Sequence, residues 1–204
     1  MTERIGKGHP AWQRHARLGW RRLRHHGPGQ LQFWLIALVI GILAGFAAVL
    51  FRAGIDALQT ALYGADDRAI LAAAAALPWY ALIAIPTFGG LVVGLILHRF
   101  TPDGRVRAVA DVIEGAALGR GRVEVRAGLA SALASLITLG SGGSSGREGP
   151  VVHLAGVIST VVADRIRASG ITGRDLLGCA VAAAVSASFN APIAGTVFAL
   201  EVVL

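Results

Sequence analysis

The chain has 204 residues, of which 54% are hydrophobic and only 15% are charged. Soluble globular domains contain about a quarter charged residues, so this composition argues against a soluble enzyme or a soluble binding module. The apolar residues form charge-free blocks at residues 31–51, 70–97, 127–146 and 176–200. Each block has about 20 residues or more, the length that crosses a bilayer core of ~30 Å. We therefore expect an all-α polytopic membrane protein.

Most of the net charge of +7 lies at the N-terminus, because residues 1–30 contain seven Lys or Arg and a single Glu. A basic segment directly before the first apolar block follows the positive-inside rule. We expect residues 1–30 to form a basic cytoplasmic tail of a multi-pass protein of the cell membrane. A nucleic-acid-binding arm would have the same charge, but attachment to an apolar block favours a topology signal, so no nucleic-acid partner is expected.

The order of apolar and polar segments predicts a series of helices. We expect helices at residues 31–62, 78–100, 108–118 and 123–139, another from about Pro150, and an apolar segment broken at Asn190-Ala191-Pro192. The last helix is still apolar at Leu204. We therefore expect residues 31–204 to be part of a larger transmembrane domain, truncated at its C-terminus.

The glycine-rich run from Gly140 to Pro150 is the segment with the most chemistry. It contains Arg147 and Glu148 between two apolar segments, where ionised groups are costly and usually functional. Irregular backbone at membrane depth occurs inside protein or beside a water-filled cavity, and Pro150 suits a first helical turn. The pattern predicts a helix N-terminus in the membrane interior, which is an anion site. The Glu148 carboxylate would fill that site when charged and leave it when protonated.

Other interpretations of the same run remain open. Arg147 and Glu148 could pair in a surface turn at the lipid headgroups. The run is no phosphate-binding loop, because Gly146 is followed by Arg147-Glu148 and not by Lys-Ser or Lys-Thr. An intramembrane serine protease could use Ser141, Ser144 or Ser145, but no histidine follows His153 to act as a base from a later helix. A carrier for another small solute is a further alternative, and a third is a fragment that does not conduct on its own. We expect no enzymatic activity, no cofactor and no metal site.

Several motifs then match one family in its order. Gly146-Arg147-Glu148-Gly149-Pro150 resembles the G-[K/R]-E-G-P signature of the CLC family of chloride channels and proton/chloride exchangers. Ile113-Glu114-Gly115-Ala116 resembles a short helix of that family, and the segments 188–195 and 198–201 resemble its F-N-A-P-x-A-G segment and the helix that follows. The resemblance extends over residues 31–204.

The resemblance implies a homodimer of subunits with separate pores, each built from two inverted halves of tilted and partial helices, of which this chain matches the first. Glu148 would be the gating and proton-exchanging residue. Gly146, Arg147, Gly149 and Val151 would surround the anion, which would be chloride.

Two departures from the family pattern affect the expected mechanism. Ala108 takes the position of the family's serine ligand, with Val109 beside it, and Asp111 takes the proline position. These two residues, Ala108 and Val109, are candidate inner-site positions. Val202 takes the position of the exchangers' intracellular glutamate, which favours a channel while leaving an exchanger open. For His153, a packing role is favoured over a proton relay.

Overall fold

The computed structural model describes residues 29–65 and 69–204, in which helices are joined by loops and no strand is present. The expected cytoplasmic tail lies almost wholly outside them. The long helices are α2 (Gln30–Tyr63), α4 (Trp79–Phe100), α6 (Val125–Gly140), α7 (Glu148–Ile166) and α8 (Gly170–Phe189). The short ones are α3 (Ile70–Ala76), α5 (Val109–Ala117), α9 (Pro192–Phe198) and the π-helical turn η1 (Ala199–Val203). The all-α prediction is confirmed.

Three described helices, α2, α4 and α7, are long and apolar enough to cross a membrane. With 34 residues, α2 is about 51 Å long at 1.5 Å per residue. The segment expected to span at residues 123–139 forms α6, which has 16 residues and is a shorter apolar helix. The chain therefore combines full spans with partial helices.

Two element boundaries differ from expectation. The alanine-rich start of the block at residues 70–97 forms a separate helix, α3, because alanine has the highest intrinsic helix propensity. Helix α7 begins at Glu148, two residues before the expected start, and Pro150 still lies in the first turn, where a missing N–H costs little. The expected break after residue 189 is present: Asn190 ends α8 in the left-handed conformation, with φ 53°, and Pro192 begins α9.

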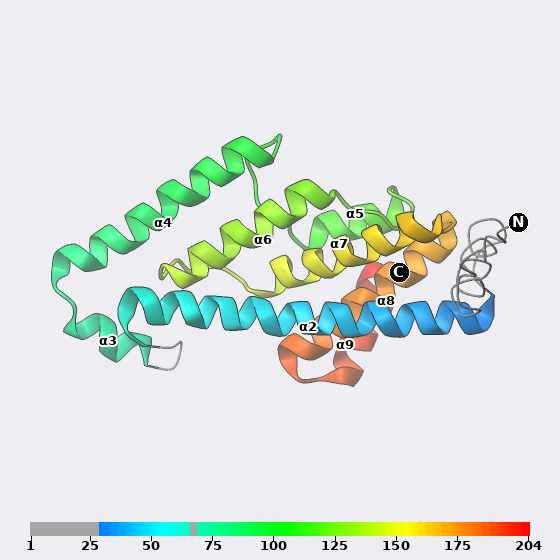
Figure 1. Ribbon diagram of the computed structural model, residues 1–204, viewed down its shortest axis with the longest axis horizontal. Helices are drawn as coiled ribbons and strands as arrows, with labels where there is room; N and C mark the ends of the chain where they lie inside the picture. The colour runs from blue at the N-terminus through cyan, green and yellow to red at the C-terminus, as the bar shows by residue number, and fades with distance from the viewer. Residues whose placement is uncertain (1–28, 66–68) are drawn as a thin grey trace, which may run out of the picture.

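Helix α8 lies at the centre of the arrangement, between α2, α7 and α9 (Figure 1). One buried cluster joins α2, α7 and α8 through residues such as Ile40, Ala155 and Leu176. A second cluster joins α5, α7, α8 and η1 through Val112, Val152 and Val203. The many small residues of α8 allow its neighbours to approach closely.

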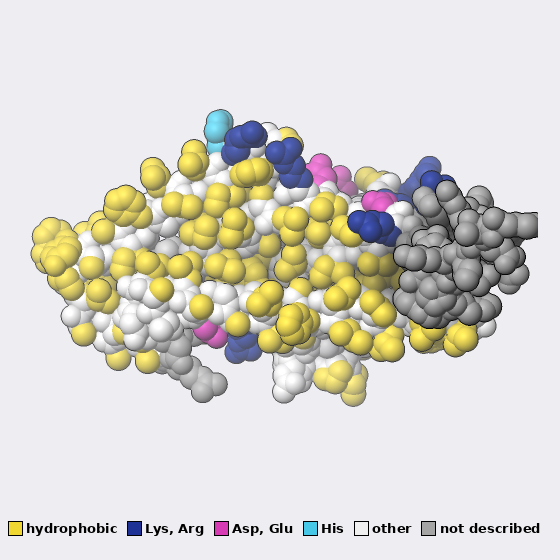
Figure 2. Space-filling model, viewed as in Figure 1, with side chains coloured by type: hydrophobic (Ala, Val, Ile, Leu, Met, Phe, Trp, Pro, Cys, Tyr) yellow, Lys and Arg dark blue, Asp and Glu magenta, His cyan; other side chains and the backbone are white. Residues whose placement is uncertain are grey.

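The outer faces of α2 and α4 are apolar. Hydrophobic side chains cover most of the surface in Figure 2, and charged side chains gather at a few places. Trp34, Phe46, Phe88 and Leu91 are all exposed. Soluble monomers seldom expose a contiguous apolar surface of this extent, so these faces are suited to lipid or to an apolar protein partner.

Candidate anion site

The candidate site begins where α6 ends. The loop at residues 141–147 returns from the C-terminal end of α6, and α7 starts alongside the middle of α2, not at its end (Figure 1). The C-terminal part of α2 fixes the start of the loop. The Tyr63 hydroxyl donates a hydrogen bond to the Ser141 carbonyl at 2.9 Å, and the Gln59 amide donates one to the Leu139 carbonyl at 3.3 Å. The N-terminus of α7 is thereby held away from both ends of the longest helix.

The first turn of α7 contains the residues predicted to surround an anion. Arg147 is the N-cap, Glu148 and Gly149 follow, and Val151 is buried one residue beyond Pro150. No side chain caps this helix. Backbone N–H groups in a first turn have no acceptor within their own helix, and the helix dipole places about half a positive charge there. This end of α7 can therefore accept a negative group.

Glu148 itself provides one negative group. Its side chain is half-buried and turns back toward the loop, since a Cβ added at Gly146 would lie 3.3 Å from Glu148 Oε2. Within residues 29–65 and 69–204, the structure gives the Glu148 carboxylate no ion pair and no side-chain hydrogen bond. The carboxylate thus lies beside Gly146, in the loop just before the helix.

A second helix N-terminus meets the first. Ala108 is the N-cap of α5 and Val109 is its first residue. A Cβ added at Gly149 would lie 3.7 Å from Ala108 Cα and 4.0 Å from the Val109 nitrogen. The structure therefore brings together Gly149 and the two candidate inner-site positions, about 40 residues apart in the chain. Gly146 lies in the exposed loop just before this contact.

The sequence-based prediction missed a network of charges at the start of α5. Asp111 Oδ2 accepts a hydrogen bond from the Ala108 N–H at 2.7 Å, and Asp111 Oδ1 lies 2.7 Å from Arg105 Nη2. The Arg107 guanidinium contacts Asp103 at 2.8 Å, Asp111 at 3.4 Å and Glu124 at 2.7 Å. The spacing from Ala108 to Asp111 is that of a capping box. This spacing was the feature of the sequence from which the hydrogen bond between Ala108 and Asp111 could have been predicted.

This network changes what the α5 N-terminus offers. Burial raises the pKa of the Asp111 carboxyl, but the Ala108 N–H and the guanidinium groups of Arg105 and Arg107 outweigh it and hold the pKa below its ordinary value. Asp111 therefore stays charged at neutral pH. It uses the N–H of Ala108 and leaves the N–H of Val109, in the first turn, without an acceptor in its own helix.

Comparison with known proteins identifies the family. A sequence model described as "Voltage gated chloride channel" matches residues 89–204, which is more than half of the chain. The chain belongs to this CLC family. It is 37% identical over 172 residues to a putative chloride channel protein, ClcB-like, of Ralstonia nicotianae. It is 31% identical over 170 residues to the voltage-gated ClC-type chloride channel ClcB of Yersinia pseudotuberculosis, and 36% identical over 176 residues to that of Escherichia coli.

The alignment with these CLC relatives covers 82% of this chain but only 40–41% of theirs. The chain thus spans about two fifths of the length of the curated relatives that it matches. The predicted CLC-like, all-α membrane fold agrees with this membership.

The remaining predicted positions of the CLC chain lie in η1 and in the loop before α7. Val202 belongs to η1 and is partly exposed, and its neighbour Glu201 lines an apolar groove with α9. The Ser141 hydroxyl donates to the Thr138 carbonyl at 3.2 Å, and Ser144 and Ser145 are exposed in the loop. No hydrogen bond joins a described serine to His153, so the described residues contain no Ser–His pair of the kind a serine protease uses.

Proposed function

We propose that this chain forms part of a chloride pathway in which the N-termini of α5 and α7 bind the anion and Glu148 gates it. The observation that carries the proposal is the contact of the two helix N-termini at Gly149 and Ala108, beside the middle of α2. Helix N-termini attract anions through free N–H groups and the helix dipole. Transporters use discontinuous helices in the same way near the bilayer midplane.

In this proposal Glu148 is a tethered competitor of the anion. When charged, its carboxylate occupies the α7 N-terminus; when protonated, it gives way to chloride. Gly146, Arg147, Gly149 and Val151 surround the anion, and Val109 contributes from α5. The relatives named as ClC-type chloride channels support chloride as the substrate. A proton taken up by Glu148 is either coupled to chloride transport, as in an exchanger, or only opens a channel.

The test is chloride efflux from proteoliposomes that contain the complete protein, with external pH followed at the same time. Glu148→Ala and Glu148→Gln are compared with Glu201→Gln, a control outside the two helix ends. We expect chloride efflux in the wild type and in the control. Uphill proton movement that Glu148→Ala abolishes identifies an exchanger; efflux without proton movement identifies a channel.

The proposal also has outcomes that contradict it. Unchanged rate and pH dependence of efflux in both Glu148 variants would exclude gating by this residue. Absence of chloride flux under all conditions would favour the alternative of a carrier for another small solute.

We also propose that the N-terminus is cytoplasmic in the cell membrane and that two copies assemble. The C-terminal end of α7 and the start of α8 lie at the end of the molecule where α2 begins (Figure 1). These segments and the turn after α5, which packs against the start of α8, contain Arg120, Arg122, Arg165, Arg167 and Arg174. Together with the basic residues before α2, they give this end the positive charge that is typical of the cytoplasmic side. Dimer formation follows from the likeness to the CLC family and is tested by cross-linking of the complete protein in membranes.

A further inference from the structure

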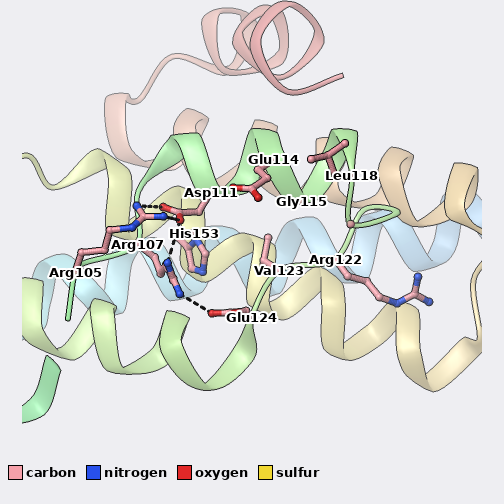
Figure 3. A pocket seen from close by; sticks show the side chains of 11 residues that line it. Arg105, Arg107, Asp111, Glu114, Gly115, Leu118, Arg122, Val123, Glu124 and His153 are labelled. Carbon is pink, nitrogen blue, oxygen red and sulfur yellow. Dashed lines mark hydrogen bonds and ion pairs between the residues drawn. The ribbon is translucent and has the colours of Figure 1, made fainter. Parts of the chain in front are cut away.

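A polar cavity lies between α5 and the segment that leads into α6 (Figure 3). Its volume is about 380 Å³, and its walls come from α5, from the loops on either side of α5 and from His153 of α7. Figure 3 shows side chains of both charges around it, Arg107, Asp111, Glu114, Arg122 and Glu124, with the His153 ring beside Arg107 and Asp111. A polar cavity of this size holds several water molecules, each of which takes about 30 Å³ in the liquid.

His153 is the anomaly in this wall. Its side chain is 1% exposed, yet neither Nδ1 nor Nε2 has a hydrogen-bond partner among the described residues. A buried polar group without a partner costs about 1–3 kcal/mol, so an apolar side chain would fill the same space at lower cost. Because His153 borders the cavity, we expect water there to be the missing partner of the ring and the source of its protons.

The neighbouring helix leaves room for the imidazole. Gly128 of α6 faces the ring, and a Cβ added there would lie 2.7 Å from both Cδ2 and Nε2 of His153. Any larger residue at this position would displace the ring from the cavity wall. The packing of α6 on α7 therefore depends on a glycine at the point where the histidine approaches.

The charges facing His153 come from each neighbouring element. Asp111 and Glu114 lie on α5, Arg107 precedes α5, and Arg122 and Glu124 lie on the segment leading into α6. Arg107 is already paired with Asp103, Asp111 and Glu124, so the cavity carries no uncompensated positive charge next to the ring. Among these surroundings Asp111 favours an imidazolium, whereas burial of the ring favours the neutral imidazole.

We propose that His153 is a proton-binding site at the buried end of this water-filled cavity and that its protonation strengthens anion binding at the α7 N-terminus. A hydronium ion in the cavity gives its proton to a ring nitrogen and leaves as water; the reverse step returns the proton. The added charge lies five residues from Glu148, a rise of about 7.5 Å along α7. The stronger anion binding rests on the proposed chloride site at the α7 N-terminus. The binding of a proton by His153 does not depend on that site.

The cavity determines which compartment supplies the proton. It extends along α5 to Leu118 and Gly119, near the Arg122–Asp164 ion pair at the C-terminal end of α7. This is the end of the molecule where α2 begins (Figure 1). His153 therefore responds to the pH on the side of the N-terminal tail, independently of Glu148.

The experiment uses the complete protein in a planar bilayer, where the pH of each side is set separately between 5 and 8, the range in which histidine changes charge. Chloride currents give the half-saturating chloride concentration for the wild type, His153→Gln and the control His98→Gln, whose side chain is exposed at the end of α4. In the wild type and the control, acidification of the N-terminal side should lower this concentration roughly six- to fortyfold, as a unit charge 7.5 Å away does at effective dielectric constants of about 40 to 20. His153→Gln should keep the high-pH value at every pH.

A second measurement tests the proton site without transport. The NMR signals of ring-labelled histidine in the complete protein are compared with those of His153→Gln to assign His153, and are followed from pH 5 to pH 8. Titration of the His153 signal supports the proposal even if no chloride current is found, in which case the chloride site itself fails. A His153 signal that does not titrate, or an unchanged pH dependence of chloride binding in His153→Gln, would overturn it.

Discussion

Among single residues, Asp111 has the greatest influence on the α5 N-terminus. The Ala108 side chain has no hydroxyl to offer an anion, and the Ala108 N–H is used by Asp111. A carboxylate in the first turn of a helix neutralises part of the dipole charge. The two helix N-termini that meet at Gly149 therefore each have an acidic side chain of their own, Asp111 on α5 and Glu148 on α7. In the part of the chain that the structure describes, the ion pairs with arginine are made by Asp111 and not by Glu148.

Asp111→Asn should strengthen anion binding. The amide oxygen still accepts the Ala108 N–H, while the negative charge beside the helix end is lost. A charge in the first turn of a helix changes the electrostatic free energy at that helix end by about 0.3–1 kcal/mol. The half-saturating chloride concentration should therefore fall about two- to fivefold. Chloride titration by calorimetry on the complete protein measures this change. Asp103→Asn, in the same network but outside α5, is the matched control, and equal effects of both variants would contradict the assignment.

The same network predicts sensitivity to acid. Burial raises the pKa of Asp103, but hydrogen bonds with Arg105 outweigh it, so the pKa values of Asp103 and Asp111 both lie below the ordinary value. For such groups the stabilisation is complete above the unfolded pKa of about 4 and is lost as the pH falls through the folded pKa. The midpoint of thermal unfolding in detergent should therefore fall between pH 6 and pH 3. Asp111→Asn should make this fall with pH less steep, and an equally steep fall in the variant would argue against the network.

Between elements, the turn from α5 to α6 is held against the start of α8. Gly121 has φ 76°, and a Cβ there would meet the backbone of Gly173 and Arg174. The Arg174 guanidinium also donates to the Ala116 carbonyl at 2.8 Å, and Arg122 pairs with Asp164 of α7. This junction sets the position of α5 and hence of its N-terminus.

Gly121→Ala should therefore destabilise the protein more than Gly64→Ala. Both glycines have the left-handed conformation, with φ 76° and 75°, but a Cβ at Gly64 would meet no atom within 4 Å. Gly64→Ala should cost about 1–2 kcal/mol from backbone strain alone, and Gly121→Ala about 1–3 kcal/mol more from overpacking. The midpoints of thermal unfolding of the two variants in detergent measure this difference. Similar midpoints would mean that the α5–α8 junction accommodates the added methyl group without loss of stability.

For the whole molecule, the distribution of charge supports the proposed orientation. Exposed apolar residues dominate α2 and α4, and the α7–α8 turn, which contains Arg165 and Arg167, lies at the end of the molecule where α2 begins (Figure 1). The α3 segment lies at the opposite end, next to the C-terminal end of α2. The proposed orientation places these two ends on opposite sides of the membrane.

Cysteine labelling tests this orientation. In a Cys179→Ser background, Ile171→Cys and Ala76→Cys each add a thiol at an exposed position, at the start of α8 and the end of α3. A membrane-impermeant maleimide added to intact cells should label Ala76→Cys and should label Ile171→Cys only after lysis. The reverse pattern would place the N-terminus outside the cell.

The sequence by itself determined the membrane class, the long helices and the break after Asn190, because these depend on local composition and on the conformations of neighbouring residues. It also located the α7 N-terminus to within two residues, through the glycine run and Pro150. Tertiary structure alone decided that Ala108 meets Gly149, that Asp111 and Arg107 form a network with Glu124, and that His153 faces Gly128 without a hydrogen-bond partner. The helices that bring these residues together are packed by contacts between segments far apart in the chain, and no local periodicity specifies which polar groups then face one another.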